Sequence, residues 1–324
     1  RPTGAPTYDA SMRFSLMTEP QLGGTYDDIL AAARWAERNG MVSFARSDHY
    51  YSGRDPKPGA TDALTTLAGL ARDTDTIRLA VLVTPITFRH PAVIAKTAAT
   101  LDQMSGGRFD LGVGTGWMEA EHEAFGLPFP SWSERFERVT ETLAYLEAAF
   151  GGEGAAFRGD HYTLEADVAP VPSGLRTIVG GTGPTRTPTL AGAYADEYNH
   201  IVAPASDVAP KVDVMRQGAT DAGRDPGSVT VTMMGPVLVG RDEAEYTERL
   251  QKAASERDLE PSELEARLTT SGVPLGSGDR LAEHFAALAE IGVEAYYLQW
   301  IPTDDLEGLD ETHAALRAAV SGLG

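Results

Sequence analysis

Cysteine is absent from all 324 residues, which excludes disulfides, thiolate metal sites and a cysteine nucleophile. No run of about 18 apolar residues occurs, so no segment is predicted to span a membrane. Positive charge is scarce, because 27 lysines and arginines face 47 aspartates and glutamates and leave a formal net charge of −20. That charge argues against non-specific binding to nucleic acid or to an anionic membrane surface. A phosphorylated ligand is still compatible with it, because backbone N–H groups can bind phosphate inside an acidic protein.

Three common catalytic signatures are missing as well. No serine lies in a nucleophile elbow, so a triad hydrolase has no support. No HExxH or similar ligand spacing occurs, and we predict no metal site; a site assembled from histidines and glutamates remains a weaker alternative. The glycines Gly112, Gly114 and Gly116 end an apolar strand but do not form the dinucleotide fingerprint, because its last glycine would stand where Trp117 is.

The first eleven residues lack the apolar core of a signal peptide. We expect residues 1–11 to form an N-terminal extension and residues 12–324 to form a single domain. Met12 is a plausible native start, and the expected location is the cytoplasm.

The rest of the chain alternates short apolar segments with longer segments of helical periodicity, which is typical of βα units and a parallel sheet. An acidic, helix-rich stretch at 242–268 follows the seventh strand, and a glycine-rich stretch at 151–164 is expected to form a small hairpin. Eight units without a dinucleotide fingerprint predict an α/β fold of the (β/α)8 TIM-barrel type, with an inserted helical segment after the seventh strand. A doubly wound sheet is the alternative. The strands are expected at 12–17, 41–46, 77–83, 108–113, 176–179, 197–202, 229–239 and 295–300.

Barrels of this kind bind ligands at the carboxyl ends of their strands. Asp48 and His49 follow the second strand, and a neutral imidazole can give or take a proton near pH 7. When the Asp48-His49 pair is considered alone, an N-cap aspartate beside a surface histidine is a more common explanation than a role in proton transfer. Glu119 and Glu121 follow the fourth strand on an expected turn or helix, and the Glu121-His122 pair is the part that could reach inward.

A glycine-rich loop, Gly180–Gly183, opens directly onto a helix after the fifth strand. Such a loop can turn backbone N–H groups toward an anion, with the field of the helix N-terminus in support. Thr182 and Thr185 can add hydroxyl groups, and Arg186 can add a bidentate clamp. A tight strand-to-helix turn that needs glycine geometry explains the same pattern equally well.

Several stretches together resemble the bacterial luciferase-like superfamily of flavin and deazaflavin oxidoreductases. They are LDQMSGGRFDLGVGTGWMEAEHEAFG (101–126), SDH (47–49), LVTPITFRHPAVIAKTAATLDQMS (82–105), IVGGTGPTRTPTLAGAYADEYN (178–199) and GSGDRLAEHFAALAEIGVEAYYLQ (276–299). Their order along the chain is that of the family, which makes the set more specific than any single motif. The family fold is a TIM barrel with an inserted segment after the seventh strand, in agreement with the strand count.

The resemblance is greater to the branch that uses the deazaflavin coenzyme F420 than to the FMN-dependent monooxygenases, which more often have Glu-His-His where this chain has Asp48-His49-Tyr50. It implies hydride transfer between F420 and a small organic substrate in a homodimer. An FMN-dependent monooxygenase is the alternative, and a non-catalytic flavin- or deazaflavin-binding protein is the second alternative.

The family also implies roles for individual residues. His49 becomes the proton donor or acceptor beside the ring, and Asp48 contacts the ring edge or orients the histidine. A bulge in the third strand, often with a cis non-proline peptide, supports the back of the ring. The residues that match the bulge, the polar contacts and the phosphate site are Val81, Leu82, Val83, Thr84, Thr115, Gly180, Gly181, Thr182 and Gly183, to which we add Arg186.

One position departs from the family pattern. Trp117 stands where the sugar-phosphate dehydrogenases of this branch have a catalytic glutamate, and the nearest carboxylates are Glu119 and Glu121. This departure argues against a sugar phosphate and favours a more apolar pocket for an unsaturated, carbonyl or imine substrate. We therefore expect Trp117 beside the cofactor, with a rim aromatic at the barrel mouth as the simpler interpretation. The three glycines before it are expected to leave room for a flat ring.

Overall fold

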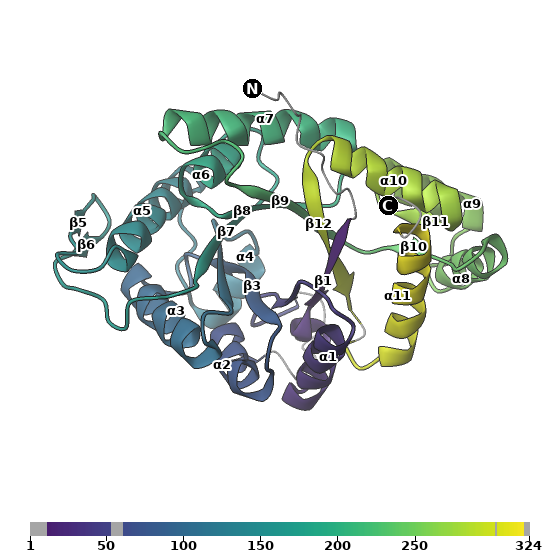
Figure 1. Ribbon diagram of the computed structural model, residues 1–324, viewed down its shortest axis with the longest axis horizontal. Helices are drawn as coiled ribbons and strands as arrows, with labels where there is room; N and C mark the ends of the chain where they lie inside the picture. The colour runs from purple at the N-terminus through teal and green to yellow at the C-terminus, as the bar shows by residue number, and fades with distance from the viewer. Residues whose placement is uncertain (1–11, 53–60, 302, 321–324) are drawn as a thin grey trace, which may run out of the picture.

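The computed structural model of the chain describes residues 12–52, 61–301 and 303–320. Eight parallel strands close into a barrel in the order β1-β12-β9-β8-β7-β4-β3-β2 (Figure 1), which confirms the predicted TIM barrel. The barrel strands are β1 (Arg13–Thr18), β2 (Ser43–Arg46), β3 (Arg78–Pro85), β4 (Phe109–Gly114), β7 (Arg176–Gly180), β8 (Glu197–Ile201), β9 (Thr230–Gly235) and β12 (Val293–Trp300).

Helices cover the outside of the barrel. Local sequence signals explain where they begin and end. Thr25 forms a capping box with Asp28 at the start of the first helix, and Gly40, with φ +70°, follows its end. The surrounding helices are α1 (Tyr26–Arg38), α2 (Ala63–Asp73), α3 (Pro91–Ser105), α5 (Trp132–Phe150), α6 (Arg186–Tyr194), α7 (Ala205–Asp221), α10 (Gly278–Glu290) and α11 (Leu306–Val320), with two short helices, η1 (Pro20–Leu22) and α4 (Glu119–Phe125).

The insertion after the seventh barrel strand is also present, but the strand before it is shorter than predicted. The expected strand 229–239 is interrupted at Pro236, which has no N–H to donate to a ladder. Beyond the interruption, β10 (Leu238–Val239) pairs in parallel with β11 (Leu275–Gly276). Between them lie α8 (Glu243–Ser255) and α9 (Pro261–Thr270), which share a separate apolar cluster with these two strands.

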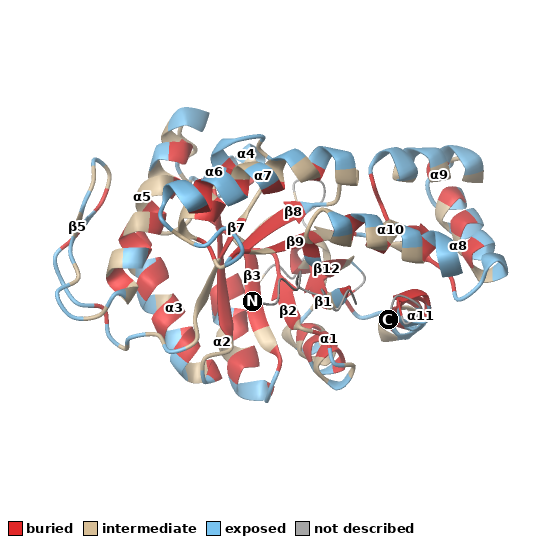
Figure 2. Ribbon diagram, turned by 45° about the horizontal axis from the view of Figure 1, so that its top comes forward, coloured by how far each residue is buried: buried red, intermediate tan, exposed pale blue. Residues whose placement is uncertain are grey.

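The predicted hairpin forms from β5 (Phe157–Arg158) and β6 (Thr163–Leu164). Figure 1 shows this hairpin and the α8–α9 insertion at opposite ends of the long axis of the molecule. In Figure 2 the barrel strands and the inner sides of the helices are buried, whereas the outer helix sides are exposed. No helix in the part of the chain that the structure describes is long and apolar enough to cross a bilayer.

A small apolar cluster fills the middle of the barrel. We call it the barrel plug: Met17, Ala45, Ala80, Leu82, Ile178 and Tyr297, with Val83 and Met234 packed against it. These side chains come from six strands, so they meet only because the sheet closes. The barrel plug lies between the two mouths of the barrel.

Candidate functional site

The C-terminal mouth of the barrel holds a histidine that is fixed by a buried carboxylate. His49 follows β2, and its Nδ1 lies 2.9 Å from Oε2 of Glu121 on α4. Glu121 is only 1% exposed, and its Oε1 accepts the backbone N–H groups of Tyr50 and, at 3.0 Å, of Tyr51. The ring of Trp117 meets the His49 ring edge-on, with 5.6 Å between the centroids.

This arrangement fixes which nitrogen of His49 carries a proton. A carboxylate oxygen can only accept, so Nδ1 donates to Glu121 and Nε2 remains the nitrogen that no described residue engages. The structure thus brings Glu121 to His49. Glu119, also a candidate, is exposed on α4, where its charge acts on Arg135 of α5 instead.

Asp48 turns away from His49 into a network around Arg89. The Arg89 guanidinium pairs with the carboxylates of Asp48 and Asp62 and donates to the Thr84 hydroxyl at 2.9 Å and to the Tyr50 hydroxyl at 2.9 Å. The side chain of Asp48 is fully buried, and so is Thr84. In the described structure, both residues therefore brace the loops beneath His49 and do not face open space.

The electrostatics of the network follow from this geometry. Burial would raise the pKa of Asp62, but the Thr65 N–H and the Arg89 guanidinium lower it to about 2. Burial raises the pKa of Tyr50 to about 12, so its hydroxyl stays protonated. The same carboxylates raise the pKa of Arg89 despite its burial. The network is therefore permanently charged near neutral pH. Arg89 and Asp62 were not among our predicted site residues. Asp62 also caps α2, and its position just before that helix is the sequence signal from which it could have been found.

The third strand has the expected bulge. The register of β3 against β4 shifts between Val81 and Thr84, and the Leu82–Val83 peptide is cis. A Cβ on Gly112, Gly114 or Gly180 would lie 2.8–2.9 Å from the methyl groups of Val83. These glycines therefore make room for Val83, and Gly112 also allows the Val81 carbonyl oxygen to approach, which an added Cβ would meet at 2.1 Å. The expectation that Gly112 and Gly114 leave room for a flat ring stays a prediction. Gly116 is needed for its own backbone, with φ +78°.

The predicted phosphate loop leads into α6. Gly181 donates its N–H to Asn199 O at 3.1 Å. Arg186 is exposed, and its guanidinium lies 5.3 Å above the ring of Phe136. Among the α-helices of the described chain, α6 alone begins with neither a side-chain cap nor an acidic residue in its first turn. Its N-terminal field is therefore uncompensated, which suits an anion.

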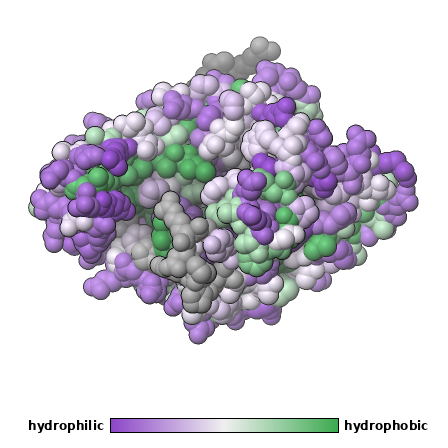
Figure 3. Space-filling model, turned by 180° about the vertical axis from the view of Figure 1, so that it is seen from behind, coloured by the Kyte–Doolittle hydropathy of each residue, from purple (hydrophilic) through white to green (hydrophobic). Residues whose placement is uncertain are grey.

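Apolar side chains collect around this mouth. Trp117 and Ile301, which follow β4 and β12, and Ile201, which ends β8, are exposed, whereas Thr115 is half-buried. On the side opposite to Figure 1, Figure 3 shows hydrophobic surface, in green, beside a hollowed region. A hollow of about 430 Å³ adjoins the Arg89 network and is lined by Thr87, Phe88, His90, Phe129 and Tyr162, among others.

A buried histidine, His200, lies on β8. His200 donates from Nδ1 to Ile201 O and accepts at Nε2 from Lys211, 2.8 Å away. Burial lowers its pKa to about 4, so it is neutral near pH 7. Nowhere in residues 12–52, 61–301 and 303–320 do three or more His, Asp or Glu side chains gather in a way that could hold a metal ion.

The chain is similar in sequence and in fold to known proteins. Among curated proteins, the pyrimidine monooxygenase RutA of Escherichia coli is 31% identical over 180 residues, which are 53% of this chain and 49% of RutA. The chain thus spans about half the length of the curated relatives it matches.

Two solved structures share the fold over almost the whole chain. One is an F420-dependent secondary alcohol dehydrogenase in complex with an F420-acetone adduct, with 23% identity, a TM-score of 0.77 and coverage of 95% of this chain and 99% of that one. The other is the oxygenating constituent of the 3,6-diketocamphane monooxygenase of Pseudomonas putida in complex with FMN, with 18% identity, a TM-score of 0.75 and coverage of 96% and 98%. The sequence profile of the luciferase-like monooxygenases matches residues 11–298. The chain therefore belongs to the luciferase-like monooxygenase family, whose members are oxidoreductases and monooxygenases.

Proposed function

We propose that this protein is a coenzyme F420-dependent oxidoreductase that transfers a hydride between the deazaflavin and a small organic substrate. The observation that carries the proposal is the His49–Glu121 pair, which lies at the C-terminal mouth of the barrel next to Trp117. The Asp48-His49-Tyr50 sequence favours F420 over FMN, because Glu-His-His is more usual in the FMN-dependent monooxygenases.

The residues present fit such a cofactor. The bulge at Leu82–Val83 and the glycines that surround Val83 form a flat, side-chain-poor wall for a tricyclic ring. The N–H groups of Thr182 and Gly183 and the uncapped start of α6, with Arg186 beside it, suit the phosphate that both F420 and FMN carry. Thr115 at the mouth is half-buried, and its hydroxyl can make a polar contact with the cofactor.

F420 supplies or accepts a hydride at its ring when bound. The protein handles the accompanying proton at Nε2 of His49. Glu121 keeps the proton of the other nitrogen at Nδ1, so Nε2 is presented with a lone pair or, when the ring is charged, with a proton. Glu121 acts through His49 and is a positioning residue. Asp48 and Arg89 act one layer further out, because they fix the loop that carries His49.

The substrate is expected to be neutral and largely apolar. Trp117 is 69% exposed at the position next to His49, and Ile201 at the end of β8 and Ile301 after β12 are exposed as well. Glu121 is engaged by three donors, so it is not available to a substrate. A carbonyl or imine needs only one proton from His49 during hydride transfer, which matches this environment.

An FMN-dependent monooxygenase is the second candidate. It is favoured by the 31% identity to the pyrimidine monooxygenase RutA over about half of each chain. A non-catalytic cofactor-binding protein is less well supported, because His49 is held in a defined orientation.

One experiment separates these candidates. We expect fluorescence titrations to show tighter binding of F420 than of FMN. With F420 and a panel of ketones and imines, His49→Ala should lower turnover by roughly 100-fold or more, the scale of a general acid or base, with little change in cofactor affinity. Tight FMN binding with oxygen-dependent turnover would overturn the F420 proposal, and binding without turnover of any substrate would favour the non-catalytic alternative.

A further inference from the structure

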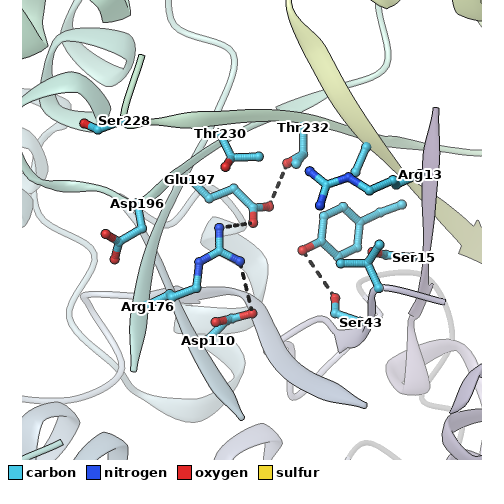
Figure 4. A pocket seen from close by; sticks show the side chains of 13 residues that line it. Arg13, Ser15, Ser43, Asp110, Arg176, Asp196, Glu197, Ser228, Thr230 and Thr232 are labelled. Atoms are coloured by element: carbon cyan, nitrogen blue, oxygen red, sulfur yellow. Dashed lines mark hydrogen bonds and ion pairs between the residues drawn. The ribbon is translucent and has the colours of Figure 1, made fainter. Parts of the chain in front are cut away.

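The opposite, N-terminal mouth of the barrel contains a cavity of about 380 Å³ (Figure 4). Its lining residues stand at or near the beginnings of the barrel strands, where Ser43, Arg176, Glu197 and Thr230 are the first residues of β2, β7, β8 and β9. This volume lies in the range of small-molecule sites and far exceeds the roughly 30 Å³ that one water occupies. The barrel plug separates this cavity from the mouth that holds His49.

Hydroxyl groups line one side of the cavity. Ser15 is 1% exposed, and its Oγ has no hydrogen-bond partner among the described residues. The Ser43 and Tyr297 hydroxyls contact each other only at 3.4 Å. Figure 4 shows Ser15 and Ser43 across the cavity from Arg176 and Asp196.

The charged side of the cavity is loosely paired. The Arg176 guanidinium lies 3.5 Å from the Glu197 carboxylate and 3.9 Å from that of Asp110, on either side of it in Figure 4. Glu197 is 2% exposed; one of its oxygens accepts from Thr232 at 2.7 Å, the other lies 3.5 Å from Arg176, and the Tyr297 hydroxyl also hydrogen-bonds to this carboxylate. Asp110 is paired closely with Arg78. The groups that face the cavity without close partners among the described residues are thus the Ser15 hydroxyl and the Arg176 guanidinium.

Two other arginines of the same protein have closer partners than Arg176. Arg46 donates to Thr61, Thr66 and backbone carbonyls at 2.8–3.0 Å. Arg108 donates to Ile77, Ala71 and Thr74 at 2.7–3.1 Å. Native structures leave few buried polar groups unpaired, so the loose set at the N-terminal mouth calls for a partner that fills the cavity.

We propose that the N-terminal mouth is a second binding site, separate from the C-terminal mouth, for a small neutral polyhydroxy compound. Each hydroxyl of such a compound both donates and accepts. It can therefore accept from Arg176, donate to Glu197 and pair with Ser15 and Tyr297 within one cavity.

The charges of the lining select against ionic ligands. A cation would face the Arg176 guanidinium, which lies between Asp110 and Glu197. An anion would face those two carboxylates and the carboxylate of Asp196, which also lines the cavity. A neutral ligand avoids both repulsions and keeps the existing ion pairs.

Isothermal titration calorimetry and ligand-observed NMR with glycerol, erythritol and ribose test this site in the full-length protein. We expect saturable binding of at least one of these polyols. For erythritol, the matched control ligand is butane-1,4-diol, which has the same chain with two fewer hydroxyls and should bind more weakly. Ser15→Ala should weaken polyol binding about 2- to 12-fold, the scale of one hydrogen bond. Ser133→Ala makes the same change on the exposed side of α5 and should leave binding unchanged.

Glu197→Gln provides a second variant; at about pH 9, above the raised pKa of Glu197, we expect about 10-fold or more loss of affinity, the scale of a buried charged acceptor. Circular dichroism melts establish that each variant is folded. Non-saturating signals for all three polyols would overturn the proposal. So would equal affinity of the wild type, Ser15→Ala and Glu197→Gln proteins, or binding that is lost in His49→Ala but persists in Ser15→Ala.

Discussion

At the scale of single residues, the contacts of Glu121 decide the state of His49. Its Oε1 accepts from the N–H groups of Tyr50 and Tyr51, and its Oε2 accepts from Nδ1 of His49. The two oxygens thus have different partners, although both belong to one carboxylate. If an amide side chain replaced this carboxylate, its oxygen and its nitrogen would each have to take one defined position, that of Oε1 or that of Oε2.

Glu121→Gln is therefore expected to invert the tautomer of His49. The two backbone N–H groups require the amide oxygen at the Oε1 position, which places the amide NH₂ against Nδ1 as a donor. Nδ1 must then accept, and the proton moves to Nε2. We expect turnover to fall by about 10²- to 10⁴-fold with little change in KM, as when other catalytic histidines are held in the wrong tautomer.

Nitrogen-15 NMR of the imidazole checks this prediction independently of activity. The wild type should show a protonated Nδ1 and the variant a protonated Nε2. An unchanged tautomer in a folded variant would contradict the role given to Glu121.

The sequence could identify His49 and Glu121 as candidates but not their contact. Position after a strand pointed to both residues, since barrel ligands bind at the carboxyl ends of strands. The two residues are 72 positions apart, however, and meet only through strand order and the orientation of α4. For the same reason, the sequence did not show that Asp48 pairs with Arg89, which is 41 positions away.

At the scale of elements, α6 has an N-terminus without a neutralising side chain. Thr185 makes no side-chain cap, and the first turn has no acidic residue in a protein with a net charge of −20. A carboxylate introduced there should therefore affect ligand binding and helix stability in opposite directions.

Thr185→Asp is expected to weaken binding of F420, or of FMN, by about 5-fold or more, because a like charge near the phosphate costs at least about 1 kcal/mol. The free energy of unfolding without ligand should stay constant or rise by up to about 1 kcal/mol, because acidic residues favour helix N-termini. Titration calorimetry and urea denaturation measure the two effects. Ser133→Asp adds the same charge to the first turn of α5 and should leave cofactor affinity unchanged. Equal affinities for Thr185→Asp and the wild type would exclude this end of α6 as the phosphate site.

The glycines of β4 show why element positions were easier to predict than their packing. Apolar runs and glycine punctuation located the strand and its end. Gly112 and Gly114 accommodate Val83 because the neighbouring β3 has a bulge. The hydrophobic periodicity of the sequence does not reveal such a bulge. The interruption at Pro236, in contrast, was visible in the sequence, because proline cannot donate within a ladder.

At the scale of the whole molecule, the barrel interior carries a carboxyl group whose ionisation opposes folding. Burial raises the pKa of Glu197 from 4.5 to about 7. Between these two values the unfolded chain has lost this proton while the folded protein keeps it. The contribution of Glu197 to the free energy of unfolding is therefore greatest at low pH and declines as pH rises through this window.

Glu197→Gln should remove this contribution. We expect the stability of the wild type relative to Glu197→Gln to decline by roughly 2–3 kcal/mol from about pH 5 to about pH 8, from the size of the pKa shift. His200, with a pKa lowered to about 4, contributes the opposite slope below its ordinary value of 6.5, but it does so in both proteins and cancels in the comparison. Urea denaturation across this pH range is the measurement, and a constant difference would contradict the prediction.

Barrel closure was predictable from eight repeating units, whereas the contents of the barrel were not. Which residues of each strand face inward depends on register, and the polar set around Glu197 meets only after closure. The sequence therefore indicated one mouth, with its loops, but not the cavity at the other.

The barrel plug also limits how molecules enter and leave the mouth that holds His49. Because its side chains fill the middle of the barrel, a molecule bound beside His49 has one route in and the same route out. Two reactants that share one passage cannot overtake each other. The reactant that lies deeper must bind first and leave last. The barrel plug therefore sets the order of binding and release.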